Sequence, residues 1–388
     1  MRRGWREEVR IWWRELDRWL LGLIVLLMGL GTLAVAAASP ASADQLSTAQ
    51  VTLDPFLFLK RHLVFQLLGL ALMVGLSFLS RDEARRLGIL AFAFMLFLLV
   101  LVPFVGVEKN GSRRWLEVGM SLQPSEFLKP AFAIMLAWIL SWRLRDPQLP
   151  VLAFASLVMA LIAGLLMMQP NLGEAVLFGG IWLVLVTLAG VSLKRIAGVA
   201  GLGLAFLVAA YFFYGNAKSR IDAFIGGGTA YDQVDLAFRT LTNGGWSGAG
   251  LWLGTRKMNL PEAHTDYIFS VIGEEFGLLF CGLVVALYCA IVLRALMRLV
   301  DEDDLFALLA GAGLIAQVGG QAFMNVLVNL QLFTSKGATL PLISYGGSST
   351  LAVCFALGLL LAITRRNPFL RREGGGLRQF LERKEERA

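Results

Sequence analysis

Charged residues are scarce in this 388-residue chain, where Asp, Glu, Lys and Arg together make up 16%. A soluble domain carries roughly 25% charged and about 45–50% apolar residues, whereas 57% of this chain is hydrophobic. The charges also interrupt apolar runs of about 20 residues, the length of helix that crosses a hydrocarbon core. The composition therefore excludes an ordinary soluble domain and predicts an all-α, polytopic membrane protein.

Cysteine is nearly absent as well. The three cysteines, Cys281, Cys289 and Cys354, all fall within apolar runs. Their spacing matches no metal-ligand pattern. We expect them to be packing or lipid-facing residues rather than members of a metal site.

Ten apolar runs are long enough to span the bilayer. They lie near residues 18–38, 62–80, 87–105, 125–142, 150–168, 173–190, 195–214, 266–293, 304–328 and 348–364. We therefore predict a ten-helix transmembrane domain over residues 18–364. A cytoplasmic amphipathic segment (1–17) precedes it, and a charged cytoplasmic tail (365–388) follows.

The positions of Lys and Arg orient these spans. With the N-terminus inside, 23 of the 35 Lys and Arg residues lie in the inner segments. Cytoplasmic segments of membrane proteins carry this excess, so both ends are predicted to be cytoplasmic. The net charge of +7 then fits contact with anionic membrane lipids and does not require nucleic acid.

The N-terminal region admits two interpretations. Trp5, Trp12 and Trp19 recur at helical spacing between arginines, which is typical of a helix lying on the inner leaflet. The apolar run that follows ends in small residues, as a signal peptide does. Its twenty residues, Trp19 to Ala38, exceed the roughly 7–15 residues of a signal-peptide core, so we predict an uncleaved span.

The longest connection runs from about residue 215 to 265, on the outer side. It has charged residues, aromatics and a glycine-rich stretch at 243–250, but no long apolar run. Connections of this length are usually functional, which favours a folded outer loop. A disordered loop is the alternative.

Two further outer segments are polar and rich in small residues, 109–130 and 334–349. Glu126 and Lys129 fall where the first of them enters a span, and a charge at that depth must be paired or face water. A functional site is therefore expected there. The alternative for Lys129 is a side chain that extends to the membrane surface from the helix end.

Asp266 lies where the long outer connection meets the eighth predicted span, followed by Glu274 and Glu275. On a helix, Glu274 would lie about 12 Å from Asp266 and about 80° away around the axis. That separation disfavours a two-carboxylate glycosidase pair, which requires less than about 9.5 Å. We expect Asp266 at the outer surface and the glutamates as partners of polar groups in the bundle.

At these residues the chain resembles the SEDS (shape, elongation, division and sporulation) family of ten-span peptidoglycan polymerases. The resemblance covers nearly all the spans. It is carried by the segments 54–61, 110–115, 123–126 with Lys129, 169–173, 260–266 and 334–349. Leu-Pro-Glu-Ala-His-Thr-Asp at 260–266 favours the division branch over the elongation branch.

The resemblance implies glycosyl transfer with lipid II in the bacterial inner membrane at the division septum. The acceptor hydroxyl must lose a proton, and Asp266, which matches the essential aspartate of the family, is the candidate base. The lipid diphosphate leaving group needs cations. The candidate substrate-binding residues are Arg113, Arg114, Lys129, Glu126, Gln123, His264, Lys336, Ser344 and Ser348.

The family likeness also implies partners. It suggests a divalent cation (Mg²⁺ or Mn²⁺) without fixing metal ligands, and no organic cofactor. The implied protein partners are a class B penicillin-binding protein and other division proteins.

Two positions depart from the family pattern. Many relatives have a basic residue where this chain has Ser121, and the family motif Gln-Pro-Asp reads Gln-Pro-Asn here, ending at Asn171. Glu174 follows three residues later, so an acid at this turn has shifted along the chain. The effect of either change on catalysis is left open by the sequence.

Two other functions compete with the polymerase. A lipid II flippase would also use intramembrane charges, but its site should lie near the midplane, whereas these motifs cluster on one side. The third possibility is a non-catalytic division scaffold that binds partners through the charged tail.

Overall fold

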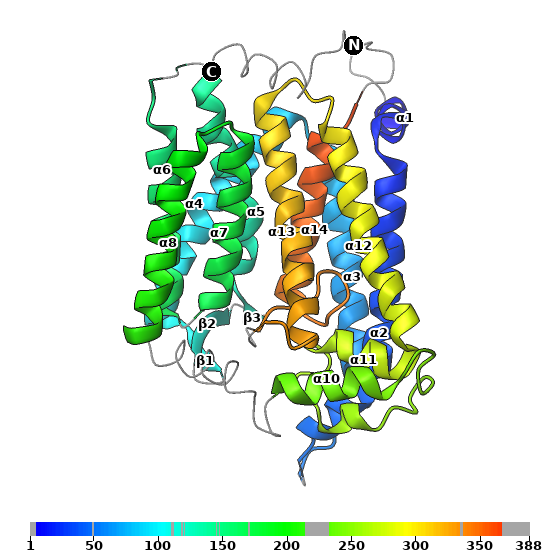
Figure 1. Ribbon diagram of the computed structural model, residues 1–388. Coiled ribbons are helices and arrows are strands. Elements are labelled where there is room, and N and C mark those ends of the chain that lie inside the picture. Colours follow the sequence, from blue (N-terminus) through cyan, green and yellow to red (C-terminus); the bar gives the residue numbers. More distant parts are fainter. Residues whose placement is uncertain are drawn as a thin grey trace.

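A computed structural model describes residues 5–48, 50–109, 112–117, 119, 121–144, 146, 148–169, 171–213, 233–333 and 337–366. Long helices stand side by side and form one bundle (Figure 1). The helices of the first half are α1 (Trp5–Glu15), α2 (Arg18–Leu46), α3 (Leu57–Ser77), α4 (Arg81–Val105), α5 (Pro124–Ser141), α6 (Val151–Met168) and α7 (Leu172–Leu188). Those of the second half are α8 (Leu193–Phe213), α10 (Gln233–Asn243), α11 (Ile268–Phe276), α12 (Leu278–Leu299), α13 (Leu305–Asn329) and α14 (Gly347–Ile363). The short 3₁₀ helices are η1 (Trp142–Leu144) and η2 (Arg256–Asn259).

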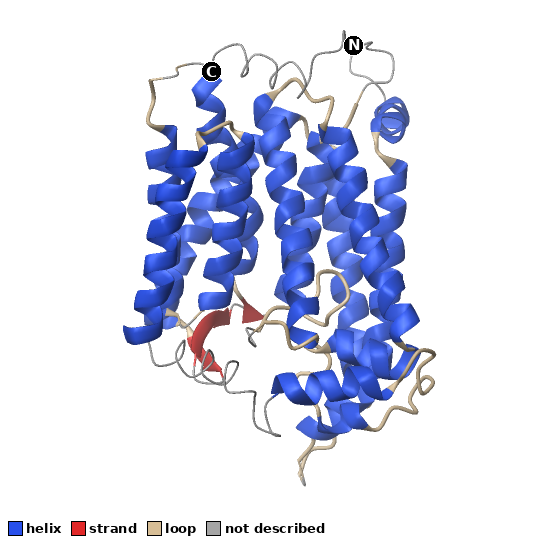
Figure 2. Cartoon of the chain, in the orientation of Figure 1, coloured by secondary structure: helices blue, strands red, loops and turns tan. Residues whose placement is uncertain are grey.

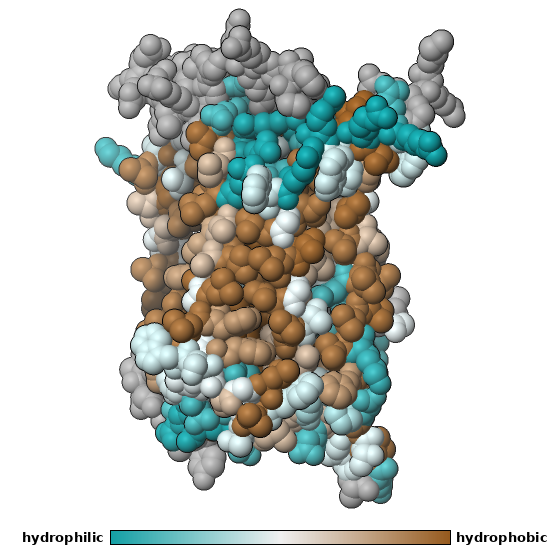
Figure 3. All heavy atoms as spheres, turned by 90° about the vertical axis from the view of Figure 1, so that its right-hand side faces the viewer, coloured by the Kyte–Doolittle hydropathy of each residue, from teal (hydrophilic) through white to brown (hydrophobic). Residues whose placement is uncertain are grey.

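Within the described residues, seven helices are long and apolar enough to cross a membrane: α2, α3, α4, α5 with η1, α6, α12 and α13. The apolar helices α7 and α14 are 17 residues each. Leu67, Leu90 and Leu157 are each more than 60% exposed on the outside of the bundle. Such residues belong against lipid, and the hydrophobic band between two more hydrophilic ends is visible in Figure 3. The prediction of an all-α, multi-pass membrane protein is confirmed.

The eighth predicted span, 266–293, is not one helix. It consists of α11 and α12, which meet at Gly277 with φ of 84°. Glycine adopts this conformation at no steric cost. The part long enough to cross a membrane is therefore α12, while α11 packs against α10 at the end of the bundle (Figure 1). Glu274 and Glu275 lie in the last turn of α11 and not within α12.

A small antiparallel sheet was not predicted. The strands β1 (Val107–Lys109), β2 (Ser112–Glu117) and β3 (Ser121–Leu122) pair in that order. The sheet follows α4 and lies at the end of the bundle where α10 and α11 also lie (Figure 2). It places β2 beside the start of α5.

Ion pairs hold the opposite end of the bundle together. Asp17 caps α2 and is buried, and its Oδ2 lies 2.8 Å from Nε of Arg294 and 2.6 Å from Nε of Arg298. Arg81 binds Glu302 at 2.8 Å. These contacts bring residues from several predicted inner segments to the end of the bundle that carries α1.

The helix α1 lies partly against the bundle. Trp12 is buried, donates a hydrogen bond to Ser77 at 3.0 Å and stacks on Phe78, with ring centroids 4.4 Å apart. Trp5 and Trp19 remain more than 70% exposed. The predicted amphipathic helix therefore ends at Glu15, and one of its tryptophans is a packing residue.

Candidate functional site

A cavity of about 1170 Å³ opens at the end of the bundle that carries the sheet. It is built from the start of α3, the sheet, the start of α5, the segment 261–266 before α11, and the segment 337–349, which runs into the first turn of α14. Its charged lining residues are Lys60, Arg61, Arg114, Glu126, Glu262 and Asp266. The chain therefore gathers three cations and three carboxylates around one polar cavity.

The backbone at Asp266 is fixed by α13. Nδ2 of Asn325 donates to the Asp266 carbonyl at 2.8 Å, and Nδ2 of Asn329 donates to it at 3.2 Å. The side chain of Asn329 also accepts from Ser270 Oγ at 2.6 Å. Both asparagines are buried. The start of α11 is thus pinned to the bundle, while the half-buried Asp266 carboxylate lines the cavity.

Arg114 and Asp266 both lie beside Gly337. Arg114 is 7% exposed, and its Nε donates to the carbonyl of Gln169 at 3.1 Å. A β-carbon placed on Gly337 would lie 3.5 Å from Oδ2 of Asp266 and 3.8 Å from Nη1 of Arg114. The carboxylate and the guanidinium therefore border the same small space in the cavity wall.

Arg113, although adjacent, does not line the cavity. Successive side chains of a strand point to opposite faces, and Arg113 is 54% exposed with Nε 3.4 Å from Oε2 of Glu108. Of the two arginines named from the sequence, the structure brings only Arg114 to the cavity.

Lys129 lies behind the cavity wall. It is 1% exposed, and its Nζ lies 2.9 Å from Oε2 of Glu126, 2.9 Å from Oε1 of Gln321 and 4.0 Å from Oε1 of Glu174. Nε2 of Gln123 donates to Glu174 at 3.1 Å. The lysine therefore does not extend to the membrane surface but holds Glu126, which lines the cavity, in a buried polar network.

This network contains Glu174, the acid that stands three residues beyond Asn171. Glu174 is 5% exposed on α7 and reaches the start of α5. The other departure, Ser121, is an exposed cavity-lining residue of β3. The acid near Asn171, Glu174, thus lies buried behind the cavity, and Ser121 is a small polar residue at the cavity edge.

His264 and Ser344 position the backbone around the cavity. The His264 ring is 8% exposed and lies 4.2 Å from the Phe58 ring and 5.4 Å from the Tyr345 ring. Burial lowers the pKa of His264 to about 4, although Glu262 opposes that shift. Ser344 is buried, and its hydroxyl donates to the Thr265 carbonyl at 2.6 Å.

Ser348 lines the cavity directly. Its hydroxyl accepts a hydrogen bond at 3.1 Å from the backbone N–H of Gln123, which is also a lining residue. Lys336 lies outside the described residues. The structure thus places Asp266, Arg114, Glu126, Gln123 and Ser348 in one cavity.

Lys60 and Arg61 were missed as site residues. Both lie in the first turn and a half of α3 and line the cavity. Lys60 forms an ion pair with Asp54 and lowers the pKa of that exposed carboxyl, mainly through a side-chain hydrogen bond. Their sequence signal was a pair of cations at the outer end of a span, within the segment 54–61.

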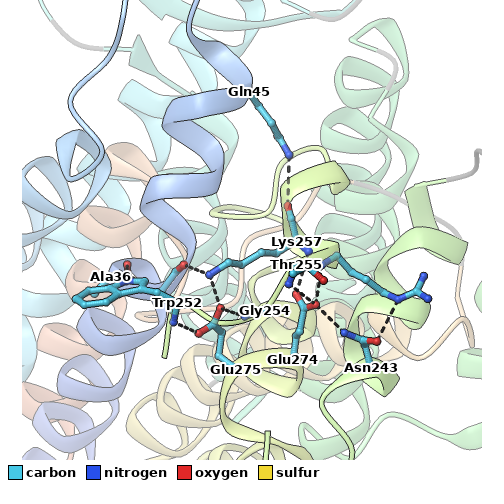
Figure 4. Close-up of polar contacts among 11 residues, drawn as sticks. Ala36, Gln45, Asn243, Trp252, Gly254, Thr255, Lys257, Glu274 and Glu275 are labelled. Atoms are coloured by element: carbon cyan, nitrogen blue, oxygen red, sulfur yellow. Dashed lines mark hydrogen bonds and ion pairs between the residues drawn. The ribbon is translucent and has the colours of Figure 1, made fainter. Parts of the chain in front are cut away.

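Glu274 and Glu275 organise the segment before the cavity (Figure 4). Glu274 accepts hydrogen bonds from the backbone N–H groups of Arg256 and Lys257 at 2.7 and 2.9 Å. Glu275 forms an ion pair with Lys257, and both side chains are no more than 3% exposed. The glutamates therefore bind the loop at 252–257.

No group of three or more His, Cys, Asp or Glu side chains with metal-binding geometry exists among the described residues. The cavity carboxylates come from separate elements, with Glu126 on α5 and Asp266 just before α11. The three cysteines are free thiols within α12 and α14.

Fold and cavity define a class: a multi-pass helical membrane protein with a polar site at one end of its bundle. Residues 18–368 match the family model of FtsW, RodA and SpoVE, described as cell cycle proteins. The chain belongs to this family, the SEDS family.

Individual relatives agree with this assignment. The "Probable peptidoglycan glycosyltransferase FtsW" of Caulobacter vibrioides is 36% identical over 365 residues, which cover 94% of this chain and 93% of the relative. A protein of the same name from Halorhodospira halophila is 38% identical, over 90% of each chain.

Solved structures also match. One, from "Structural coordination of polymerization and crosslinking by a peptidoglycan synthase complex", has a TM-score of 0.74 and 28% identity, over 90% of this chain and 97% of the other. The crystal structure of the rod shape determining protein RodA of Thermus thermophilus has a TM-score of 0.67 and 29% identity, over 91% and 97%.

Proposed function

We propose that this chain is a peptidoglycan glycosyltransferase that polymerises lipid II on the outer face of the bacterial inner membrane during septal wall synthesis. The observation that carries the proposal is the convergence of Asp266 and Arg114 beside Gly337. The volume of the cavity, about 1170 Å³, exceeds the roughly 300–1,000 Å³ of a small-molecule pocket, as a site for two lipid-linked sugars requires.

Asp266 is the proposed general base. The 4-hydroxyl of the acceptor sugar attacks the anomeric carbon of the donor and transfers its proton to the Asp266 carboxylate. The new glycosidic bond forms as the bond from the anomeric carbon to the diphosphate oxygen breaks. The hydrogen bonds from Asn325 and Asn329 to the Asp266 carbonyl hold the base in place and reduce the cost of orientation.

Cations of the cavity are proposed to stabilise the diphosphate as it leaves. Arg114 is held in place by its bond to the Gln169 carbonyl, and a fixed guanidinium suits phosphate oxygens. Lys60 and Arg61 lie at the α3 edge of the cavity. Lys336 precedes Gly337 in the sequence and is proposed as a further cation. Glu126, Gln123 and Ser348 are proposed to bind polar groups of the sugars.

The other predicted residues are assigned supporting roles. Lys129 positions Glu126, while His264 and Ser344 position the segments 264–265 and 340–345 through their packing and hydrogen bonds. Arg113, which lies outside the cavity and pairs with Glu108, is proposed to face the membrane surface and not the substrate. A divalent cation, if used, would depend mainly on the oxygens of the diphosphate, because the described side chains provide no metal cluster.

Ten spans with both ends in the cytoplasm are part of the proposal. The seven long apolar helices, together with α7, α8 and α14, correspond to the ten predicted runs. The Arg-rich end near α1 then faces the cytoplasm, and the cavity faces outward. A class B penicillin-binding protein is the proposed partner, since one matching structure is that of a peptidoglycan synthase complex.

Reconstitution with labelled lipid II tests the function. Purified protein in vesicles, supplied with its partner transpeptidase and a divalent cation, should convert lipid II to glycan chains. If lipid II crosses the vesicle membrane and no glycan chains form, the protein is a flippase instead. Failure of both activities in the complete complex would favour the scaffold.

A further inference from the structure

The loop at 244–255 exposes several large apolar side chains. Trp246 is 72% exposed, Leu251 41%, Trp252 52% and Leu253 68%. Residues 244–261 include no acidic residue, and Arg256 is exposed beside them. This combination of apolar side chains and a cation is costly in water and suits a lipid surface with anionic phosphates.

The backbone of this loop is held rigidly. Trp252 has a φ of 65°, which is uncommon for a residue with a bulky side chain. Its N–H donates to the buried Glu275 carboxylate, and the Lys257 ammonium binds the same carboxylate. Buried charges thus hold an unfavourable backbone conformation that places the Trp252 side chain beside Ala36 of α2 (Figure 4).

The bundle itself gives the height of the loop in the membrane. The indole N–H of Trp252 donates to the carbonyl of Ala36 at 3.0 Å. Ala36 lies 18 residues beyond Arg18 on α2, which is about 27 Å along the helix. A hydrocarbon core is about 30 Å thick. With Arg18 at the inner boundary of the hydrocarbon core, Trp252 therefore lies at the outer boundary of that core.

A second helix gives a similar height. The N–H of Leu279 donates to the carbonyl of Trp246 at 3.3 Å, and Leu279 lies 15 residues before Arg294 on α12. That is about 22 Å along the helix, and Arg294 binds Asp17 next to the start of α2. Leu279 is itself 68% exposed, so the apolar surface of the loop continues the lipid-facing surface of α12.

We propose that residues 244–255, here called the tryptophan loop, rest in the outer leaflet at the boundary between hydrocarbon and headgroups. Tryptophan favours this zone because its ring is apolar and its N–H is polar. The loop is joined by Glu274 and Glu275 to α11, which begins two residues after Asp266. The loop therefore fixes the depth of Asp266 in the membrane. The choice of the outer leaflet rests on the proposed topology, and the consequence for a lipid-linked substrate rests on the proposed function.

Spin labels measure the depth of the loop without any activity assay. Labels are placed at Trp246→Cys or Leu253→Cys in full-length protein in which the exposed Cys289 is replaced by Ser. Asn259→Cys is the matched control, because Gln45 binds the carbonyl of the preceding Met258 at 2.6 Å. Gln45 lies nine residues beyond Ala36 on α2, or about 13 Å further outward.

In vesicles of phosphatidylethanolamine and phosphatidylglycerol, labels at 246 and 253 should be relaxed by oxygen and shielded from a water-soluble nickel chelate. The label at 259 should show the reverse. The ratio of oxygen accessibility to nickel accessibility should be several-fold higher at 246 and 253 than at 259. Nickel accessibility at 246 and 253 equal to that at 259 would overturn the proposal. Shielding of 246 and 253 only after the partner protein is added would also overturn it, in favour of a protein-binding surface.

Discussion

Asp266 and Arg114 both lie beside Gly337, which has a φ of 65° and would place a β-carbon 3.5 Å from Oδ2 of Asp266 and 3.8 Å from Nη1 of Arg114. The absence of a side chain at this position keeps open the space that both charged groups border. If substrate is bound there, an added methyl group should interfere with it directly.

Gly337→Ala should therefore lower the polymerisation rate about tenfold, which corresponds to about 1.4 kcal/mol. Gly245→Ala is the control, because Gly245 also has a positive φ, of 58°, and open space around its β-carbon. Both changes should cost about 1–2 kcal/mol of stability for the left-handed backbone. Thermal denaturation and polymerisation assays separate the two effects, and equal loss of activity in both variants would argue against substrate beside Gly337.

The two adjacent arginines should behave differently. Arg114→Ala removes a buried cavity guanidinium and should reduce polymerisation by about 10²–10³-fold, as loss of a preorganised electrostatic group does. Arg113→Ala removes only an exposed ion pair, whose contribution is about 0–1 kcal/mol, and should leave the rate nearly unchanged. Similar losses of polymerisation rate in the two variants would contradict the assignment of Arg114, and not Arg113, to the site.

This difference marks a limit of the sequence. Apolar runs were enough to predict the multi-pass helical fold, and the outer location of Asp266, which follows from the positions of Lys and Arg, stays a prediction. Arg113 and Arg114 could not be distinguished, because the strand β2 is short and was not predicted. Gly277, which separates α11 from α12, lies between Glu275-Phe276 and a long apolar run, and a single glycine in such a pattern does not by itself mark a helix end.

Contacts between distant parts of the chain were also beyond the sequence. Lys129 could equally have reached the membrane surface, and only the folded bundle shows that Gln321 lies 2.9 Å from its ammonium. Lys257 binds Glu275 because the loop folds back on α11. Neither pairing follows from spacing along a helix.

The Lys257–Glu275 pair should be important for stability. Both side chains are almost fully buried, and removal of one partner leaves a buried charge, which costs about 3–5 kcal/mol. Lys257→Met should therefore lower the unfolding free energy by about that amount, and Glu275→Gln in the same protein should recover part of it. Glu108→Gln breaks the exposed pair with Arg113 and should cost less than about 1 kcal/mol. Urea denaturation in detergent would contradict this account if Lys257→Met and Glu108→Gln had the same small effect.

His264 should make stability depend on pH. Burial lowers its pKa to about 4 in the folded protein, whereas an unfolded histidine has a pKa of about 6.5. Between these values the unfolded state binds more protons, so stability falls as the pH decreases from about 6.5 to about 4. Replacement by Phe, which keeps a ring beside Phe58 and Tyr345, should reduce that fall.

The measurement is the melting temperature of wild type and His264→Phe at pH 7 and pH 5. Only the difference between the two proteins reports on His264, because every other titrating group is shared. An unchanged pH dependence in the variant would show that His264 is not kept neutral by burial.

The most direct test of the proposed function is the rate of glycan formation by Asp266→Asn. The change keeps the size of the side chain and removes the base, and should lower polymerisation by about 10²–10⁴-fold. Asp235→Asn is the control, an outer aspartate on α10 that pairs with Arg239 at 2.8 Å and lies outside the cavity. With purified complex and labelled lipid II, we predict long glycan chains from wild type and Asp235→Asn and none from Asp266→Asn. Wild-type polymerisation by Asp266→Asn would contradict the account.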